Sequence, residues 1–220
     1  VQKVSQQWNH LKEIIKMKKI AIIGAGGFGR EVKMLIDNIN QKEKTYEIIG
    51  YFDDKEYTEN INGLPYLGKI SEIEKINFPL SLVISIADPK TKKKIYTAIK
   101  NENIDFPNLI HPSVLIGEDD VILGKGNIIC AGTIITVNIK IEDFVILNLS
   151  CTVGHDTVVK SFSSFMPSVN ISGEVVIHEG VYVGTGAQII NLLEIGEYTI
   201  VGAGAVVSKT LPAKCTAVGI

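Results

Sequence analysis

The sequence contains few of the residues that mark metal sites and disulfide frameworks. Its 220 residues include only three cysteines, Cys130, Cys151 and Cys215, and their spacing fits neither a CxxC pair nor a metal-ligand cluster. An odd number of cysteines also excludes a fully paired disulfide framework. We therefore expect a cytoplasmic protein without a bound metal ion.

The chain also has little net charge and no long apolar segment. The formal net charge of -2 at pH 7 gives no electrostatic reason to expect nucleic acid or an anionic membrane as a partner. Glycine, asparagine or charged residues interrupt every apolar stretch within a few positions, so none is long enough to span a membrane. Hydrophobic residues still make up 45% of the chain, enough for one large or two small cores.

A repeat of six residues dominates the second half of the chain. Every sixth residue from Leu123 to Val207 is apolar, without a break in register. At 45% hydrophobic content, such a run in one frame would arise by chance with a probability of about 10⁻⁵. The apolar positions are Leu123, Ile129, Ile135, Ile141, Leu147, Val153, Val159, Phe165, Ile171, Ile177, Val183, Ile189, Ile195, Val201 and Val207.

A period of six is neither that of an amphipathic helix nor that of a plain β-strand. It is typical of a hexapeptide β-helix, in which each repeat supplies one short strand and one corner. If three repeats form one triangular coil, residues 18 apart in sequence stack at the strand spacing of about 4.8 Å. The repeat therefore predicts which residues lie above one another.

Before the repeat, strand and helix signals alternate. Together with Asp88 and Pro89, which suit a helix N-terminus, they predict a β-α-β-α-β unit, about half of a doubly wound nucleotide-binding domain. We expect strands at Lys18–Gly24, Glu47–Asp54 and Leu80–Ala87, and helices at Gly27–Asn38 and Pro89–Lys100.

The chain is expected to have three parts. Residues 1–17 would form an N-terminal extension, residues 18–107 the α/β domain, and residues 108–220 the β-helix, whose first recognisable turn is Ile116-Gly117. Met17 directly precedes the first strand, and we expect it to be the natural start of the protein. A short helix packing on a neighbour is the alternative for the preceding segment.

A glycine-rich loop follows the first expected strand. Residues Gly24 to Gly29 read G-A-G-G-F-G, which satisfies the G-x-G-x-x-G pattern between a strand and a helix. Glycines allow the backbone to approach a diphosphate, and the helix N-terminus supplies N–H donors. Asp53 and Asp54 end the next strand, where an acidic residue contacts ribose in dinucleotide-binding domains.

These features alone indicate NAD, but the length of the domain favours a smaller ligand. Only three strands are expected before the repeat, and no second nucleotide-binding half follows. Half of such a fold better suits the diphosphate of a mononucleotide, and a purely structural loop is the third possibility. The expected ligand contacts are Gly24, Gly26, Gly27, Phe28, Gly29, Asp53, Asp54 and Ala87.

Four lysines crowd the start of the second expected helix, where the helix dipole disfavours positive charge. They are Lys90, Lys92, Lys93 and Lys94. We expect a solvated face, with a phosphate contact as the alternative.

Among the four histidines, His155 is the best candidate for proton transfer. It lies beside Asp156 at a corner of the expected β-helix, whereas His10 lies in the extension, His111 in a linker and His178 directly after an apolar repeat position. An imidazole can take up a proton near neutral pH, and an adjacent carboxylate can fix its tautomer. An exposed corner histidine without a role is the alternative.

The stacking of successive coils adds geometry to this corner. Gly173 falls one coil above His155, and Asn138 falls one coil below Asp156, where it can orient the carboxylate. A glycine above the base can present an unobstructed backbone N–H to a developing oxyanion.

The repeat carries two similar segments, Gly184–Ala187 (GTGA) and Gly202–Ala205 (GAGA). With them it resembles the left-handed β-helix acyltransferases, and the whole chain looks like the NeuD/PglD group of sugar acetyltransferases. The resemblance implies the handedness of the β-helix and a nucleotide-linked sugar in the α/β domain. The family often has a histidine near the substrate at the position of Phe28, and this departure leaves the acceptor sugar and its reacting group open.

The resemblance also implies roles for individual residues. His155 would be the general base, supported by Asp156, and the Gly173 N–H would bind the oxyanion. The backbone of the two Gly-x-Gly-Ala segments would bind the pantetheine arm of acetyl-CoA, and Lys209 its phosphates. The expected catalytic residues are His155, Asp156, Asn138 and Gly173, and the expected cofactor contacts are Gly173, Thr185, Gly186, Ala203, Gly204 and Lys209.

Such β-helices usually form homotrimers, with acetyl-CoA in the groove between neighbouring subunits, so the resemblance implies an active site between subunits. Family members usually continue beyond the ending Ala217–Ile220, and further residues are expected there.

We therefore predict an α/β half-Rossmann domain followed by an all-β left-handed parallel β-helix, acting as a cytoplasmic homotrimer. The predicted reaction moves acetyl from acetyl-CoA to the amine of a nucleotide-linked 4-amino-6-deoxy sugar used in surface polysaccharide synthesis. O-acetylation of a sugar hydroxyl is the alternative within the family. From other classes, a non-catalytic nucleotide-sugar-binding scaffold and an NAD-binding sensor remain. The sequence leaves open the nucleotide base, the sugar and the acylated carbon.

Overall fold

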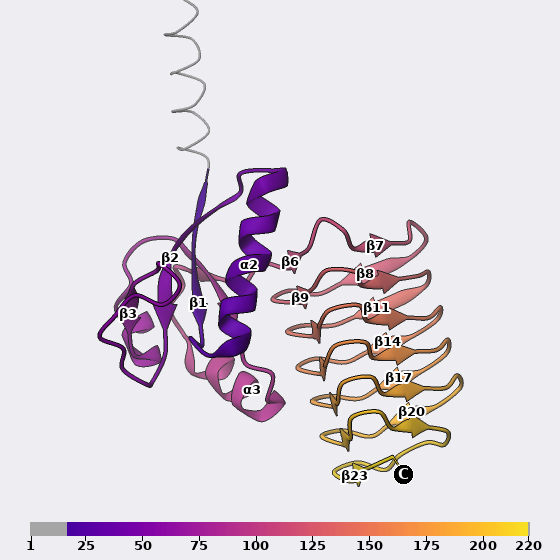
Figure 1. Ribbon diagram of the computed structural model, residues 1–220. Helices are drawn as coiled ribbons and strands as arrows, with labels where there is room; N and C mark the ends of the chain where they lie inside the picture. The colour runs from indigo at the N-terminus through magenta and orange to yellow at the C-terminus, as the bar shows by residue number, and fades with distance from the viewer. Residues whose placement is uncertain (1–16, 220) are drawn as a thin grey trace, which may run out of the picture.

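A computed structural model describes residues 17–219, which form an α/β domain beside a parallel β-helix (Figure 1). The expected extension, residues 1–17, lies outside the described residues except for Met17, and so does His10. Within the described part of the chain, no helix is long and apolar enough to cross a membrane.

The α/β domain contains a five-stranded parallel sheet in the order β3-β2-β1-β4-β5. The predicted strands and helices are confirmed, whereas β3 and β5, of three and two residues, are too short to leave a periodic signal in the sequence. The elements are β1 (Lys18–Ile23), α2 (Gly27–Lys42), β2 (Tyr46–Phe52), β3 (Tyr66–Gly68), the 3₁₀ helix η1 (Ile70–Lys75), β4 (Leu80–Ile84), α3 (Pro89–Ala98) and β5 (Ile104–Asp105).

Alternate residues of β1 pack on opposite faces of this sheet. Ile20 and Ile22 pack in the cluster that contains apolar residues of α2, whereas Ala21 and Ile23 pack with those of η1 and α3. Because both faces are covered, the central strands are apolar along almost their whole length.

The β-helix has three faces of parallel strands. The seven-stranded face consists of β6 (Leu109–Ile110), β9 (Ile128–Ile129), β12 (Ile146–Leu147), β15 (Ser164–Phe165), β18 (Tyr182–Val183), β21 (Ile200–Val201) and β23 (Thr216–Ala217). The six-stranded face consists of β7 (Leu115–Ile116), β10 (Ile134–Ile135), β13 (Thr152–Val153), β16 (Asn170–Ile171), β19 (Gln188–Ile189) and β22 (Val206–Val207). The five-stranded face consists of β8 (Val121–Leu123), β11 (Ile139–Ile141), β14 (Val158–Val159), β17 (Val176–Ile177) and β20 (Glu194–Ile195).

Consecutive strands lie on consecutive faces, so three columns of corner residues run along the β-helix. We call each column an edge and name it after one of its residues. The Gly186 edge joins the seven-stranded to the six-stranded face, the His155 edge joins the six-stranded to the five-stranded face, and the Tyr198 edge joins the five-stranded to the seven-stranded face.

The predicted stacking of each coil on the one before it is confirmed through the middle of the β-helix. Val153 pairs with Ile171, and Ile171 pairs with Ile189, with all three side chains in one buried apolar core. The first coil is longer by one residue, because Leu109 pairs with Ile128 and not with Asn127, which the regular step would select. Because of this extra residue, β6 is out of register with the six-residue repeat. The β-helix therefore begins with β6, one strand before the turn at Ile116-Gly117 that the sequence indicated as its first.

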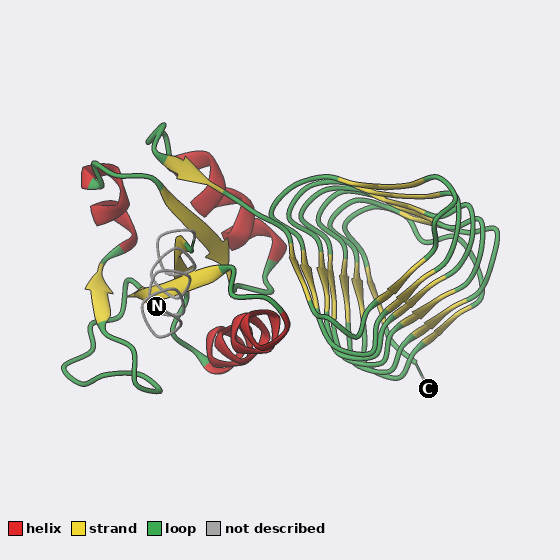
Figure 2. Ribbon diagram, turned by 90° about the horizontal axis from the view of Figure 1, so that it is seen from above, coloured by secondary structure: helices red, strands yellow, loops and turns green. Residues whose placement is uncertain are grey.

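The α/β domain packs against the seven-stranded face, as seen along the β-helix in Figure 2. Ile128 and Ile146 point away from the β-helix core yet are 1% exposed, because they join the cluster that contains apolar residues of α2. On the Tyr198 edge, Phe144 and Phe162 are stacked with their ring centroids 5.4 Å apart. Tyr96 of α3 packs on them, with its ring centroid 4.3 Å from that of Phe144.

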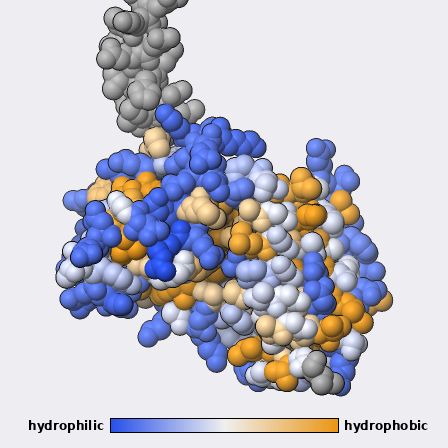
Figure 3. Space-filling model, in the orientation of Figure 1, coloured by the Kyte–Doolittle hydropathy of each residue, from blue (hydrophilic) through white to orange (hydrophobic). Residues whose placement is uncertain are grey.

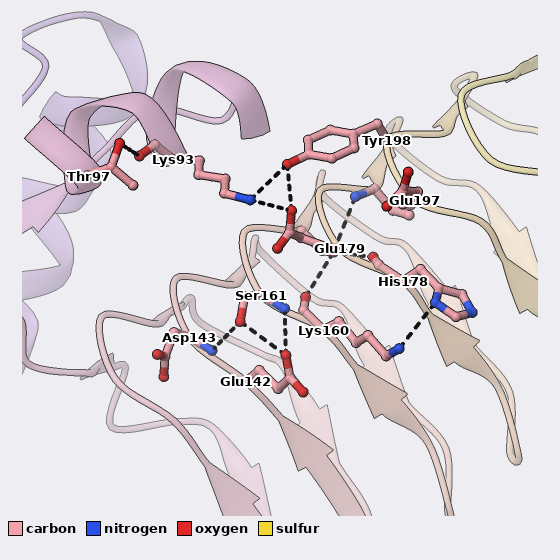
Figure 4. Close-up of polar contacts among 12 residues, drawn as sticks. Lys93, Thr97, Glu142, Asp143, Lys160, Ser161, His178, Glu179, Glu197 and Tyr198 are labelled. Atoms are coloured by element: carbon pink, nitrogen blue, oxygen red, sulfur yellow. Dashed lines mark hydrogen bonds and ion pairs between the residues drawn. The ribbon is translucent and has the colours of Figure 1, made fainter.

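Two of the clustered lysines take part in this contact, so the expectation of a solvated face is wrong for them. Lys92 is 1% exposed, and its Nζ donates to Ser164 Oγ at 2.9 Å. Lys93 Nζ lies 2.7 Å from a carboxylate oxygen of Glu179, which also accepts a hydrogen bond from Tyr198 (Figure 4). Local sequence could not reveal this, because the partners lie far along the chain, in the β-helix.

Replacing the buried Lys92 with methionine is expected to stabilise the fold at neutral pH. Burial lowers the pKa of Lys92 well below its usual range, against a smaller opposing effect of Asp88. Between that lowered pKa and the usual value of about 10.4, the unfolded chain binds more protons than the folded one, so stability rises with pH. We expect Lys92→Met to raise the free energy of unfolding by about 1–4 kcal/mol at pH 7.

Urea unfolding at pH 7 and pH 9.5 tests this expectation. The gain should shrink at the higher pH, because Lys92 of the wild-type protein then folds at a smaller penalty. Lys94→Met, which changes an exposed lysine of the same helix, is the matched control. An equal gain at both pH values would contradict the explanation.

Candidate active site

Asn138, Asp156 and His155 form a chain of hydrogen bonds on the His155 edge. Asn138 Nδ2 donates to Asp156 Oδ1 at 3.0 Å, and His155 Nδ1 lies 2.7 Å from Asp156 Oδ2. The side chains of His155 and Asp156 are 57% and 48% exposed, so the group is open to a ligand. The predicted position of Asn138 beneath Asp156 is confirmed.

Left-handed backbone conformations at the corners build this column. Asn138 and Asp156 occupy equivalent corner positions one coil apart, with φ values of 55° and 58°. Asparagine and aspartate adopt this conformation more readily than most residues, because their side chains can hydrogen-bond locally. The same geometry aims both side chains outward, where they meet.

The contact with Asp156 assigns the roles of the two ring nitrogens of His155. Hydrogen bonds from His155 and Asn138 lower the pKa of the Asp156 carboxyl, so it is ionised at neutral pH and can only accept hydrogen bonds. Nδ1 of His155 therefore carries the proton, and Nε2 of the neutral ring has a free lone pair. The arrangement can take a proton from a substrate at Nε2.

Gly173 lies against the imidazole ring on the next coil. A Cβ atom at this position would lie 2.5 Å from both Cε1 and Nε2 of His155, so only glycine leaves room for the ring. Among the described residues, the Gly173 N–H donates no hydrogen bond to the protein. Nε2 and a backbone donor thus lie close together, as general base catalysis with oxyanion stabilisation requires.

Replacing Gly173 with alanine should therefore displace the His155 ring. The backbone at Gly173 is not left-handed, so alanine fits the fold but its methyl group collides with the ring. A misplacement of about 1 Å can cost about 10²-fold in rate, and we expect a loss of kcat of that size. A rate assay alongside the melting temperature tests this, and a normal rate would show that the ring position does not matter.

The other described histidines have structural partners. His111 lies between β6 and β7, and its Nε2 contacts Asn38 of α2 at 3.1 Å. His178 Nε2 lies 3.1 Å from a carboxylate oxygen of Glu194 on the five-stranded face. A Cβ at Gly196, one coil above His178, would meet Ala213 and not the imidazole ring, so the stacking of glycine on histidine is not repeated there.

The glycine loop connects β1 to the first turn of α2, as predicted. A Cβ at Gly29 would collide with the Gly24 carbonyl oxygen, so Gly29 is needed for the turn itself. Gly26 and Gly27 are exposed, and a Cβ on either would meet no atom within 4 Å. Their backbone therefore faces open space at a helix N-terminus, a suitable place for a diphosphate.

Asp53 braces this loop. Its Oδ2 accepts a hydrogen bond from the Ala25 N–H at 2.8 Å, and its Oδ1 accepts one from the Lys55 N–H at 2.9 Å. Asp54 lies next to it and accepts from the Ile70 N–H of η1 at 3.3 Å. The acidic pair thus lies beside the glycine loop, where the sequence placed it.

A cavity of about 490 Å³ opens beside the loop. Gly24, Asp53 and Asp54 line it, together with residues of η1 and α3 that the sequence did not suggest, including Glu74. The only sequence signal for these walls is the helical spacing of the lining residues on α3. The lining residues from these two elements are Ile70, Ser71, Glu74, Thr91, Lys94, Ile95 and Ala98.

Phe28 and Ala87, two of the expected ligand contacts, do not line the cavity beside the loop. Phe28 is half-buried and packs with the apolar cluster under α2. Ala87 lines a second cavity of about 460 Å³, formed between the start of α3 and the lower coils of the β-helix.

The structure separates the remaining expected site residues onto two edges. Lys209 follows β22 on the His155 edge, in the same column as His155 and Gly173. Thr185, Gly186, Ala203 and Gly204 lie on the Gly186 edge, where the Gly204 N–H donates to the Thr185 carbonyl at 2.8 Å. The six-stranded face lies between the two edges, so one chain does not bring these groups together.

The glycine loop is also separated from His155. The α/β domain packs on the seven-stranded face, and the His155 edge joins the other two faces. In the triangular cross-section of Figure 2, this edge is the corner opposite the domain. Within residues 17–219, no group of His, Cys, Asp and Glu residues is arranged to hold a metal ion.

Several known proteins resemble this chain. Residues 19–99 match the family described as the PglD N-terminal domain. The chain is 29% identical to GDP-perosamine N-acetyltransferase from Escherichia coli O157:H7, over 79% of this chain and 78% of that protein.

Solved structures match almost the whole chain. WeeI from Acinetobacter baumannii AYE is 32% identical, with a TM-score of 0.83 and coverage of 92% of this chain and 97% of that one. PerB from Caulobacter crescentus, in complex with CoA and GDP-perosamine, is 28% identical, with a TM-score of 0.82 and coverage of 91% and 94%.

Proposed function

Because the chain belongs to the NeuD/PglD-like family of sugar acetyltransferases, we propose that it transfers acetyl from acetyl-CoA to the amine of a nucleotide-linked 4-amino-6-deoxy sugar. The observation that carries this proposal is the hydrogen-bonded chain from Asn138 through Asp156 to His155, with Gly173 beside Nε2. Relatives named as N-acetyltransferases support an amine rather than a hydroxyl as the acceptor.

In the proposed reaction, His155 Nε2 removes a proton from the amine as its nitrogen attacks the thioester carbonyl carbon. Asp156 stabilises the resulting imidazolium through its contact with Nδ1. The Gly173 N–H donates to the oxyanion of the tetrahedral intermediate. When the carbon–sulfur bond breaks, the imidazolium returns its proton to the CoA thiolate, and the amide product remains.

The position of each group indicates how the site is completed. The glycine loop, the Gly186 edge and the His155 edge lie on different sides of one chain, so we propose that a neighbouring copy brings its His155 edge to the first two. Leu115, Ile134 and Val206 of the six-stranded face are exposed, and Figure 3 shows apolar residues scattered over the surface of the β-helix. A homotrimer, as the family resemblance implies, would cover such residues and place three sites between subunits.

We propose a cytoplasmic location, because a reducing compartment keeps thiols unpaired. All three cysteines are unpaired. Burial raises the pKa of Cys130 to about 12 and that of Cys151 to about 11, so neither thiol ionises readily.

An acetylation assay tests the proposed function. The protein is incubated with acetyl-CoA and GDP-, UDP- or dTDP-linked 4-amino-6-deoxy sugars, and release of the CoA thiol is followed together with the product mass. Matched sugars with a hydroxyl in place of the amine are the control. Equal acetylation of the hydroxyl compounds would favour the O-acetyltransferase alternative, and nucleotide-sugar binding without thiol release would favour a non-catalytic scaffold.

A further inference from the structure

The cavity beside the glycine loop has apolar lining residues from two elements. They include Ile70 of η1 and Ile95 and Ala98 of α3. Gly24 and Asp53 also line the cavity, and the diphosphate and ribose of the proposed substrate would lie beside them. A partly apolar cavity of about 490 Å³ in this place suits the base of the nucleotide.

Two carboxylates in this cavity are held by backbone hydrogen bonds. Glu74 Oε1 accepts from the Lys100 N–H at 2.9 Å, and Asp54 Oδ1 accepts from the Ile70 N–H at 3.3 Å. Within residues 17–219, the second oxygen of each carboxylate has no hydrogen-bond partner, whereas both oxygens of Asp53 are occupied. The cavity therefore offers fixed negative acceptors to a ligand that can donate.

The bases differ in what they can donate to such acceptors. Guanine presents two adjacent donors, N1–H and the N2 amino group. Both can donate to one carboxylate, either one donor to each oxygen or both donors to a single free oxygen. Uracil and thymine present one N–H between two carbonyl oxygens, which a carboxylate would repel. A cavity built to accept hydrogen bonds rejects a ligand that leaves them unmade.

We propose that this cavity binds the base of a guanosine diphosphate-linked sugar and that Glu74 is the residue that selects guanine. This inference rests on the proposed function, because it takes the substrate to be nucleotide-linked. Glu74 accepts from the donor edge of guanine through Oε2, while Oε1 stays on the Lys100 N–H. Lys94 lines the same cavity and can donate to the guanine carbonyl oxygen.

Glu74→Gln is a sharp test, because it changes one group and keeps the shape. The amide oxygen can still accept from the Lys100 N–H, which leaves the NH₂ group facing the base in place of Oε2. Donor would then face donor in guanine, whereas the carbonyl oxygens of uracil would gain a partner. Glu72→Gln is the matched control, because Glu72 lies on the same 3₁₀ helix but pairs with Lys75.

Isothermal titration of the full chain with GDP, UDP, dTDP, ADP and CDP gives the result. We expect GDP to bind at least about 10-fold more tightly than the others, and Glu74→Gln to weaken GDP binding by about 10- to 100-fold. UDP binding should be unchanged or tighter in Glu74→Gln, and Glu72→Gln should behave as the wild type. The melting temperature of each variant shows that the fold is kept.

Each contrary outcome overturns a defined part of the proposal. If UDP or dTDP binds as tightly as GDP, the assignment of guanine is wrong, while acetyl transfer to another nucleotide-linked sugar still stands in the acetylation assay. If Glu74→Gln weakens GDP and UDP equally, Glu74 has a structural role and does not select the base. If none of the diphosphates binds, the nucleotide-linked substrate fails and this inference fails with it.

Discussion

The His155→Ala variant is expected to lose about 10²- to 10⁴-fold in kcat while binding CoA and the nucleotide-linked sugar as the wild type does. The loss follows from the removal of Nε2, the proposed proton acceptor beside Gly173. Binding should be kept, because the side chain is 57% exposed and its removal leaves no cavity in the core. Steady-state rates and calorimetric binding constants measure the two effects separately.

His178→Ala is the matched control for this prediction. His178 belongs to the same β-helix and also contacts a carboxylate, that of Glu194, but it lies away from the His155 edge. Its removal should leave kcat within about twofold of the wild type, as for most surface changes. An unchanged rate in His155→Ala, or an equal loss in both variants, would rule out His155 as the general base.

The Gly27→Asp variant is expected to weaken binding of the nucleotide-linked sugar by about 10²-fold or more, because placing like charges together costs several kcal/mol. No atom lies within 4 Å of a Cβ at Gly27, so the side chain fits without a clash. A carboxylate in the first turn of α2 also favours the helix dipole, so the fold should be kept. Calorimetry measures the loss, and Gly27→Ala, which adds no charge, should bind the ligand as the wild type does.

Mixing the His155→Ala and Gly27→Asp chains, at a substrate concentration far below saturation of the Gly27→Asp variant, then tests whether each site is shared. In one chain the glycine loop and His155 lie on opposite sides, so a trimer containing both variants can form sites with a normal loop and a normal histidine. Random assembly of equal amounts should restore about a quarter of the wild-type rate if each site uses two neighbouring chains. No recovery in confirmed mixed trimers would mean that loop and histidine act within one chain.

The repeat made much of the candidate site predictable, because each coil advances the chain by the same step. The Asn138–Asp156 contact and the stacking of Gly173 on His155 both follow directly from this step. The same step also predicts that the expected cofactor contacts fall on two different edges of the β-helix. Lys209 lies three full coils beyond His155 and so returns to the same edge, whereas Thr185 lies one coil and two further faces beyond it.

Contacts between the two parts of the chain were not predictable in the same way. The burial of Lys92 and the pairing of Lys93 with Glu179 depend on how α3 packs against the Tyr198 edge. The wall of the cavity formed by η1 likewise needs the fold, because a short 3₁₀ helix shows little periodicity. Local patterns report which side of an element is apolar and not which distant residue will cover it.

Between β9 and β22 each coil advances the chain by 18 residues, so the position of a residue in the sequence decides whether its side chain points into the core or outward. Deleting one residue from a strand of these regular coils would move every later inward side chain to the outward position next to it, as a slip of one residue does in any sheet with one buried face. A corner can absorb a single residue, as it does in the first coil, where Leu109 pairs with Ile128. Removing or adding a whole coil would keep the core and change only the distance along the His155 edge, by about 4.8 Å. Viable length variants of this β-helix should therefore differ by whole coils or by residues absorbed at a corner, and coils gained between Gly173 and Lys209 would lengthen the track for the cofactor without altering the catalytic corner.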